Sequence, residues 1–215
     1  MTCTLLRADV AAVLEREHAE AERLRREHNR IAAPSEPSAD LRTSTKHRTQ
    51  YLSIGPRMGR FLYNTARSTG AQRIVEFGTS FGISTIYLAA AAADTGGRVT
   101  GSEFHQHKAE KARANLTDAG LGDRAEIRVG DARETLAELD GPIDLLFLDG
   151  ASDLYLDMLT LLEDRLTPGA WVIADNADHL AADTGFLAHV GDGSRYLTAL
   201  LGTRKGLISQ SLVIA

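Results

Sequence analysis

The stretch that decides the fold is Arg73-Ile-Val-Glu-Phe-Gly-Thr-Ser-Phe-Gly-Ile-Ser-Thr-Ile-Tyr-Leu-Ala-Ala-Ala-Ala-Ala93. Its start, Arg73 to Phe77, is short and rich in apolar and β-branched residues, which is typical of a buried strand. Gly78 and Gly82 then interrupt the pattern, and from Phe81 onward apolar residues recur at helical spacing. This order of strand, glycine turn and helix predicts the opening of an α/β nucleotide-binding sheet, in which ligands bind at the carboxyl ends of the strands.

The spacing of the glycines indicates which ligand this turn binds. A dinucleotide fingerprint has the pattern Gly-x-Gly-x-x-Gly, whose backbone amides meet a pyrophosphate. This chain instead has Glu76-x-Gly78-x-x-x-Gly82, with an acid at the end of the strand. A carboxylate repels phosphate but suits a ligand that carries an ammonium group and hydroxyls, as S-adenosylmethionine does. An NAD oxidoreductase is therefore disfavoured, whereas an ordinary turn in another doubly wound protein fits the glycine pair alone.

A second acid supports an adenosine ligand. The strand expected at Arg98 to Glu103 follows the glycine pair Gly96-Gly97 and ends in a carboxylate. Such a carboxylate can accept hydrogen bonds from both hydroxyls of a ribose. NAD-binding proteins place an acid similarly, so Glu103 predicts adenosine without choosing between cofactors.

The next expected strand, Ala125 to Val129, is followed by Gly130-Asp131-Ala132. Asp131 fits the N-cap of a helix from Arg133 to Leu139.

With these residues in order, the chain resembles the class I S-adenosylmethionine-dependent methyltransferases, in particular the catechol and caffeoyl-CoA O-methyltransferase group. The resemblance covers roughly Tyr51 to Ala215. It implies an α/β fold with a doubly wound, seven-stranded, mostly parallel sheet whose last two strands form an antiparallel hairpin at one edge. We expect residues 1–50 to be an N-terminal helical extension and linker, and residues 51–215 to be the S-adenosylmethionine-binding domain.

The resemblance also implies which residues bind the cofactor. Those expected at its methionine end are Glu76, Gly78, Ser80, Gly82, Ser84 and Asp149. Glu103 is expected at the ribose, and Asp131 with Ala132 at the adenine. For Asp131 the adenine role and the helix cap are supported equally, and they do not exclude each other.

Polar side chains follow two further expected strands, Ile143 to Leu148 and Ala170 to Ala174. Asp149 ends the first, and the pair Asp175-Asn176 ends the second. Oxygen ligands of this kind, with places left for waters and substrate, suit a hard divalent cation such as Mg²⁺. The catechol-type enzymes have Asp, Asp and Asn at the matching positions, where the metal orients two vicinal oxygens of the acceptor and lowers the pKa of the one methylated. The alternative is that these side chains only cap the next helices.

One departure from the family pattern concerns the general base. The metal-dependent group usually has a lysine three residues after the first aspartate, and here that position is Ser152. Serine at its ordinary pKa does not replace a lysine as base, and general-base catalysis contributes roughly 10²–10⁴-fold. Three explanations remain open: the metal alone acidifies the hydroxyl, another group such as His179 or Asp153 is the base, or the acceptor needs little deprotonation and no metal binds.

These considerations define the expected activity and its rivals. We expect methyl transfer to a hydroxyl of a small, catechol-like molecule, with Asp149 and His179 as catalytic residues and a divalent cation assisting. The rivals are a metal-independent O- or N-methyltransferase and, because of Ser152, a cofactor-binding module without catalysis. Tyr51, Met58 and Tyr155 are candidates for the substrate wall.

The rest of the chain completes the expected element order. Further helices are expected at Leu5–Ile31, Pro56–Thr69, His105–Ala119, Leu154–Leu166 and Leu180–Val190, and further strands at Ser194–Leu201 and Gly206–Ile214. The helical first segment mixes charges of both signs, which favours packing or dimer contact over a membrane surface.

Composition limits the partners and the compartment. Hydrophobic residues make up 43% of the chain, charged residues 25%, and the net charge is -5. These values are ordinary for a globular protein and do not predict binding to nucleic acid or an anionic membrane. The single cysteine, Cys3, excludes an intramolecular disulfide, and the N-terminus has no signal-peptide pattern. We expect a cytoplasmic homodimer.

Overall fold

The computed structural model describes residues 3–31, 48–177, 185–203 and 206–215. Within these ranges seven strands form one sheet in the order β3-β2-β1-β4-β5-β7-β6. The strands are β1 (Arg73–Phe77), β2 (Arg98–Glu103), β3 (Ala125–Val129), β4 (Ile143–Leu148), β5 (Leu166–Ala174), β6 (Tyr196–Thr203) and β7 (Gly206–Val213). The first five are parallel, and β7 runs antiparallel to both β5 and β6. The predicted doubly wound sheet with an antiparallel hairpin at its edge is confirmed.

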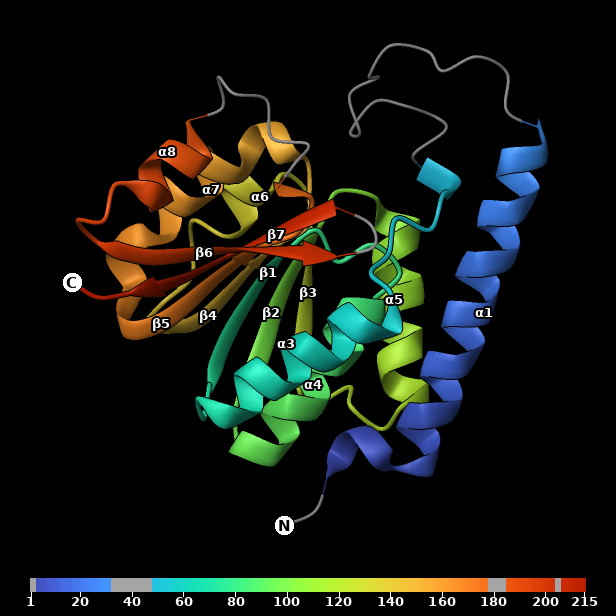
Figure 1. The fold of residues 1–215 in the computed structure, drawn as a ribbon. Coiled ribbons are helices and arrows are strands. Elements are labelled where there is room, and N and C mark those ends of the chain that lie inside the picture. Colours follow the sequence, from blue (N-terminus) through green and yellow to red (C-terminus); the bar gives the residue numbers. More distant parts are fainter. Residues whose placement is uncertain (1–2, 32–47, 178–184, 204–205) are drawn as a thin grey trace.

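Helices cover both faces of this sheet (Figure 1). The helices around the sheet are α1 (Ala8–Ile31), α3 (Pro56–Ser68), α4 (Ile83–Thr95), α5 (Gln106–Asp118), α6 (Ala132–Thr135), α7 (Tyr155–Leu162) and α8 (Phe186–Gly191). Three one-turn 3₁₀ segments occur at Thr4–Leu6, Ser152–Leu154 and Glu163–Arg165. Helices α1, α3, α4 and α5 lie on one face, and α6, α7 and α8 lie on the other.

The central strand β4 is apolar apart from Asp144 near its start, because both of its faces are covered. Its alternate residues Leu145 and Phe147 belong to the core beneath α3, α4 and α5, whereas Leu146 and Leu148 belong to the core beneath α7 and α8. All four side chains are fully buried. A parallel strand that is covered on both faces has no polar side, as the near-continuous apolar run indicated.

Several predicted boundaries were wrong. The helix expected from Leu154 to Leu166 ends at Leu162, and β5 begins at Leu166, so Thr167-Pro168-Gly169 lies within a strand that was expected to start at Ala170. The helix expected from Arg133 to Leu139 is a single turn, α6. Part of the helix expected from Leu180 lies outside the described residues, and α8 forms its end.

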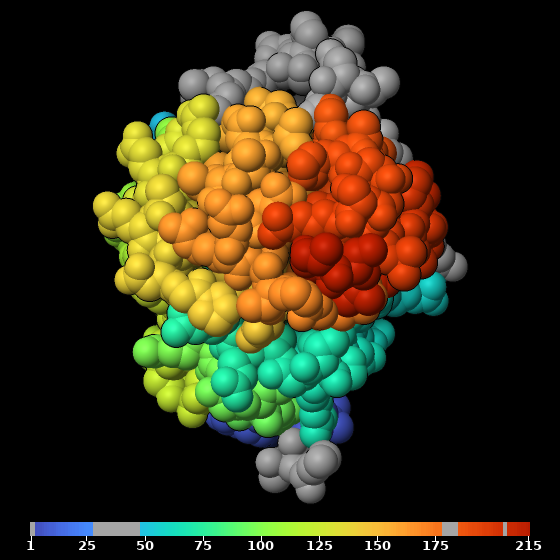
Figure 2. Space-filling view, turned by 90° about the vertical axis from the view of Figure 1, so that its left-hand side faces the viewer, coloured from blue at the N-terminus to red at the C-terminus, as the bar shows by residue number. Residues whose placement is uncertain are grey.

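The N-terminal extension packs against the sheet domain. Val10, Val13 and Leu14 of α1 are buried in the same core as α3 and α4. Thr4 donates its backbone N–H and its hydroxyl to the carboxylate of Asp94 at the end of α4, at 3.1 and 2.6 Å. Viewed from the side shown in Figure 2, the yellow-to-red surface of α6–α8 and the C-terminal strands lies above the cyan-to-green surface around α3 and α4. None of the described helices is both long and apolar enough to cross a bilayer.

Candidate active site

A cavity of about 460 Å³ lies at the carboxyl ends of the parallel strands. Eight of the predicted site residues line it: Gly78, Ser80, Glu103, Asp131, Ala132, Asp149, Asp175 and Asn176. Glu103 ends β2 and Ala132 begins α6, and the others come from the loops after β1, β3, β4 and β5. The position agrees with the rule that open α/β sheets bind ligands outside the carboxyl ends of their strands.

The glycine turn after β1 brings two strand ends together. The backbone of Gly78 has a φ of +98°, and a Cβ there would lie 2.6 Å from the carbonyl carbon of Asp149. Ser80 has a φ of +49°, a left-handed conformation that is uncommon outside glycine and clusters at functional sites. Its buried hydroxyl has no hydrogen-bond partner among the described residues. The turn therefore holds a hydroxyl without a hydrogen-bond partner among the described residues, on a residue that lines the cavity.

Glu103 holds this turn in place from the neighbouring strand. One carboxylate oxygen accepts a hydrogen bond from the Ser80 backbone N–H at 2.8 Å, and the other accepts one from the His105 backbone N–H at 2.8 Å. The side chain is 7% exposed and lines the cavity. Each carboxylate oxygen has two lone-pair sites, so both oxygens retain a site for a ligand hydroxyl.

Three residues predicted to touch the cofactor do not line the cavity: Glu76, Gly82 and Ser84. Glu76 is fully buried behind the turn, where Oε2 accepts hydrogen bonds from the hydroxyls of Thr79 at 2.9 Å and Thr85 at 2.5 Å. Gly82 permits close helix packing, because a Cβ there would lie 3.0 Å from the Ala112 side chain. Glu76 of β1 therefore links the glycine turn to α4 through these two hydroxyls. Because alternate strand residues point to opposite faces of the sheet, its side chain lies under the backbone of the turn and not in the cavity.

The burial of Glu76 predicts a pH dependence of stability. Burial raises its pKa, as does the negative charge of Glu103, although hydroxyls of Ser84, Thr85 and Thr79 oppose the shift. The native state then binds this proton more tightly than the unfolded state, so stability falls as pH rises from the ordinary carboxyl pKa of about 4 through the raised pKa. We expect Glu76→Gln to gain stability relative to the wild type over that range, measured by urea unfolding. Glu138→Gln, at an exposed site, is the control, and a pH-independent difference would contradict the prediction.

Asp131 is the N-cap of α6. Its carboxylate accepts a hydrogen bond from the Arg133 backbone N–H at 2.9 Å and pairs with the Arg133 guanidinium at 2.5 Å. The capping role is thus present in the structure. Asp131 and Ala132 also line the cavity, so the adenine role stays a prediction.

Asp149, Asp175 and Asn176 meet at the ends of the paired strands β4 and β5. The Asn176 side-chain amide lies 3.4 Å from Oδ1 of Asp149, and Asn176 has a φ of +56°. No cluster of three or more His, Cys, Asp or Glu suited to a metal occurs in the described part of the chain. The predicted set contains only two such residues, with an amide oxygen as its third donor. Two carboxylates and an amide fit a hard divalent cation that retains waters or substrate oxygens.

The candidates for a general base are reduced by the geometry. Ser152 lines the cavity, at the position where the family pattern has lysine. Tyr155 also lines it, but burial and the charges of Asp149 and Asp175 raise its pKa well above the ordinary value, and its hydroxyl lies 3.2 Å from the Asp175 carbonyl oxygen, to which it donates. Tyr155 therefore stays protonated. His179 lies outside the described residues.

The side chains predicted for the substrate wall are divided between the cavity and its surroundings. Tyr51 and Tyr155 line the cavity, whereas Met58 does not. His105, which follows the end of β2, also lines it, and the ring of His107 lies 2.7 Å from the Arg48 carbonyl oxygen.

Lys108 is a cavity residue that the sequence analysis missed. It lies on α5, is 3% exposed, and has its ammonium 5.3 Å from the centre of the Phe81 ring. Burial lowers its pKa, although the charge of Glu103 opposes this. The available signal was that Lys108 lies four residues before Ala112, which lies four residues before Leu116. This spacing places Lys108 on the inward face of the helix.

Comparison with known proteins agrees with this geometry. A methyltransferase domain matches residues 75–177. A catechol O-methyltransferase from Mycobacterium tuberculosis is 34% identical over 79% of this chain and 78% of its own. One from Niastella koreensis is 32% identical over 70% of this chain and 71% of its own. The crystal structure of an O-methyltransferase from Bacillus cereus in complex with SAH superposes with a TM-score of 0.71, at 26% identity over 94% of this chain and 90% of that one.

The order of the strands, the cavity at their carboxyl ends and the glycine turn after β1 together define a class I methyltransferase. The chain belongs to the S-adenosylmethionine-dependent O-methyltransferases, in the group that resembles catechol O-methyltransferase.

Proposed function

We propose that this O-methyltransferase acts on a hydroxyl of a small catechol-like molecule with the assistance of a divalent cation. The observation that carries the proposal is the convergence of the Glu103-braced glycine turn and the Asp149, Asp175 and Asn176 set in one cavity. The names of the relatives from Mycobacterium tuberculosis and Niastella koreensis support a catechol-type acceptor.

The cofactor would lie along the turn after β1 and the ends of β2 and β3. Ser80 offers its unused hydroxyl to the methionine end, and Glu103 accepts from the ribose hydroxyls. Asp131 and Ala132 border the adenine end, with the half-exposed ring of Phe104 beside them in the cavity wall. When bound, S-adenosylmethionine supplies an electrophilic methyl group on a sulfonium. The role of this chain is to orient that group toward the acceptor oxygen, which is worth several orders of magnitude in rate.

A cation would be held by Asp149, Asp175 and Asn176. Bound there, it would lower the pKa of the acceptor hydroxyl and fix the direction of its oxygen. The fully buried floor beneath these residues, Leu148 and Ala174, excludes water from that side. With Ser152 in place of lysine and Tyr155 held protonated, acidification of the acceptor by the cation would take over the work of the family's lysine, and the predicted alternative of Asp153 as base stays a proposal. The predicted part of His179 in proton transfer stays a proposal.

The test is calorimetric titration of the protein with S-adenosylhomocysteine, followed by methylation of catechol with Mg²⁺ and with EDTA. We expect cofactor binding without metal, and methyl transfer that EDTA abolishes and Mg²⁺ restores. Turnover that EDTA does not change would favour the metal-independent rival. Cofactor binding without turnover on any catechol would favour the non-catalytic module that Ser152 suggested, and the absence of cofactor binding would refute the proposal as a whole.

A further inference from the structure

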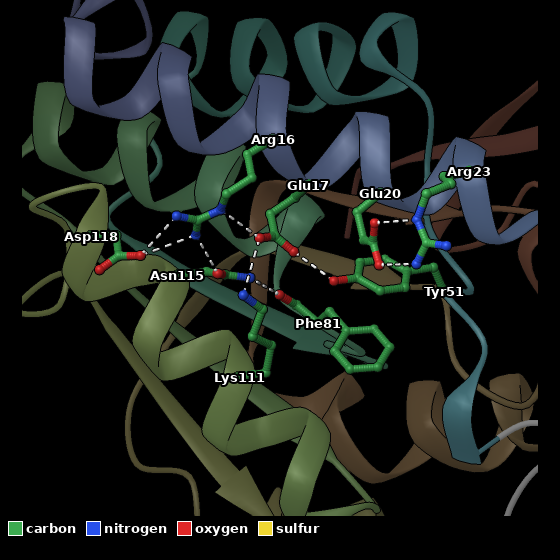
Figure 3. A network of polar contacts seen from close by, with 9 residues as sticks. All are labelled: Arg16, Glu17, Glu20, Arg23, Tyr51, Phe81, Lys111, Asn115 and Asp118. Atoms are coloured by element: carbon green, nitrogen blue, oxygen red, sulfur yellow. Dashed lines mark hydrogen bonds and ion pairs between the residues drawn. The ribbon is translucent and has the colours of Figure 1, made fainter.

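Glu17, a carboxylate on the N-terminal helix, is buried without belonging to the cavity. It is 1% exposed, in the middle of α1. Three groups surround it: Arg16 at 2.9 Å, Lys111 of α5 at 3.2 Å, and the hydroxyl of Tyr51, which donates to it at 2.7 Å (Figure 3). Although burial alone raises the pKa of Glu17, hydrogen bonds from Tyr51, Arg16 and Lys111 hold it below the ordinary value. It is therefore a fixed anion inside the fold.

The tyrosine that Glu17 holds belongs to the cavity wall. Tyr51 lines the cavity, and its ring stacks on the ring of Phe81 with centroids 4.1 Å apart and planes 20° apart. Phe81 directly follows Ser80 in the glycine turn. Since burial and the contact with Glu17 raise the pKa of Tyr51, its hydroxyl remains a donor. The position of this ring over the turn thus depends on a carboxylate of another element.

A second route connects the same helix to the same residue. Arg16 donates to the side-chain oxygen of Asn115 at 2.8 Å, and Asn115 donates to the backbone carbonyl of Phe81 at 3.0 Å. Asn115 is fully buried, and Asp118 holds the same arginine from the end of α5 at 3.0 Å. The contact through Tyr51 reaches the ring of Phe81, and the contact through Asn115 reaches its backbone carbonyl (Figure 3). The adjacent α1 residues Glu17 and Arg16 therefore both restrain Phe81 in the turn.

We propose that Glu17 is a positioning residue for cofactor binding: through Tyr51 it fixes the wall of the cavity against Phe81, and so fixes the turn that contacts the methionine end. The inference rests on the proposed binding of S-adenosylmethionine at this turn. It assigns the N-terminal helix a part in the site, although none of the α1 side chains that the structure describes lines the cavity. The same helix also carries ordinary surface pairs such as Glu22 with Arg26 at 2.8 Å, one turn apart on α1.

The test compares Glu17→Ala, Tyr51→Phe and the double variant, with Glu22→Ala as the control on the same helix. Tyr51→Phe keeps the ring that stacks on Phe81 and leaves Arg16 and Lys111 as partners of Glu17. It removes only the hydroxyl that donates a hydrogen bond to Glu17. We expect each single variant to weaken S-adenosylhomocysteine binding about tenfold by calorimetry, since a hydrogen bond to a charged group is lost. The double variant should also lose about tenfold, because both changes break one contact. KM for S-adenosylmethionine should rise in parallel, with kcat within about twofold of the wild type.

Amide hydrogen exchange of residues 78–82, measured without cofactor, reports directly on how firmly the glycine turn is held. Faster exchange there in Glu17→Ala and Tyr51→Phe, but not in Glu22→Ala, is the expected result. If Tyr51→Phe leaves affinity and exchange unchanged, Glu17 serves only stability and the inference is wrong. A wild-type protein that fails to bind S-adenosylhomocysteine would overturn the proposed function instead, and the exchange experiment would still decide whether Glu17 restrains the turn.

Discussion

Asp175→Ala is expected to lower kcat/KM for methylation of catechol by about a hundredfold or more, because metal polarisation contributes several kcal/mol and each 1.36 kcal/mol is a factor of ten. Asp175 lies at the end of β5 beside the end of β4, on the side of the cavity opposite Glu103. We therefore expect the Kd for S-adenosylhomocysteine, measured calorimetrically without metal, to change by no more than about threefold. The loss should concern the acceptor and the cation alone.

The matched control is Asp157→Ala, which removes an exposed carboxylate from α7 at a position that does not line the cavity. It should leave kcat/KM within about twofold of the wild type. A titration with Mg²⁺ adds a second measure, because the variant should need a higher concentration for half-maximal rate. Full activity of Asp175→Ala in EDTA would contradict the metal-assisted mechanism and favour the metal-independent rival.

The second large effect is expected for Glu103→Gln, which should weaken S-adenosylhomocysteine binding about a hundredfold. Both oxygens of Glu103 accept backbone hydrogen bonds, from Ser80 and from His105, at 2.8 Å. Glutamine retains one acceptor oxygen and places an N–H group against the other donor. Two hydrogen bonds to the charged carboxylate are then weakened, one from the protein backbone and one from the ribose. Losing each of them costs about 1.5 kcal/mol or more.

Glu126→Gln is the control for that substitution, since Glu126 is an exposed residue of β3 paired with Arg128 at 3.1 Å. Calorimetry of both variants, with thermal unfolding of the cofactor-free proteins, separates a binding defect from a folding defect. Unchanged affinity in Glu103→Gln would show that the ribose lies elsewhere. The proposed placement of the cofactor along β1 and β2 would then be wrong.

Much of the fold could be predicted because local pattern and tertiary role agree. The apolar run of β4 predicted a strand covered on both faces, and the sheet buries Leu145 and Leu146 on opposite sides. The helix-to-strand boundary near Thr167-Pro168-Gly169 was misplaced, because this turn-like tripeptide lies within β5, at the point where the register of β5 with β4 shifts. A turn-like tripeptide does not predict that a strand has already begun. Here β5 starts earlier because Leu166 pairs with Ile143 of β4, a contact that the local sequence does not show.

The candidate site could be predicted where a residue follows directly from a strand end. Glu103, Asp149 and Asp175 were identified in this way, and all line the cavity. Glu76 satisfied the same rule and does not line it, because its side chain points beneath the turn toward Thr79 and Thr85. Lys108 was missed because a charged helix residue is ordinarily solvated, and only packing against Phe81 shows that it is buried.

Residue order alone indicated the fold class, the succession of strands and the acids at their ends, because these depend on spacing along the chain and on the rule that parallel strands end at one edge. It could not indicate that Glu17 reaches Tyr51 across 34 positions, or that Tyr51 stacks on Phe81. Such contacts have no periodicity in sequence. They exist because α1 packs against α4 and α5, which brings Lys111 and Tyr51 to a buried carboxylate that also pairs with Arg16 of its own helix.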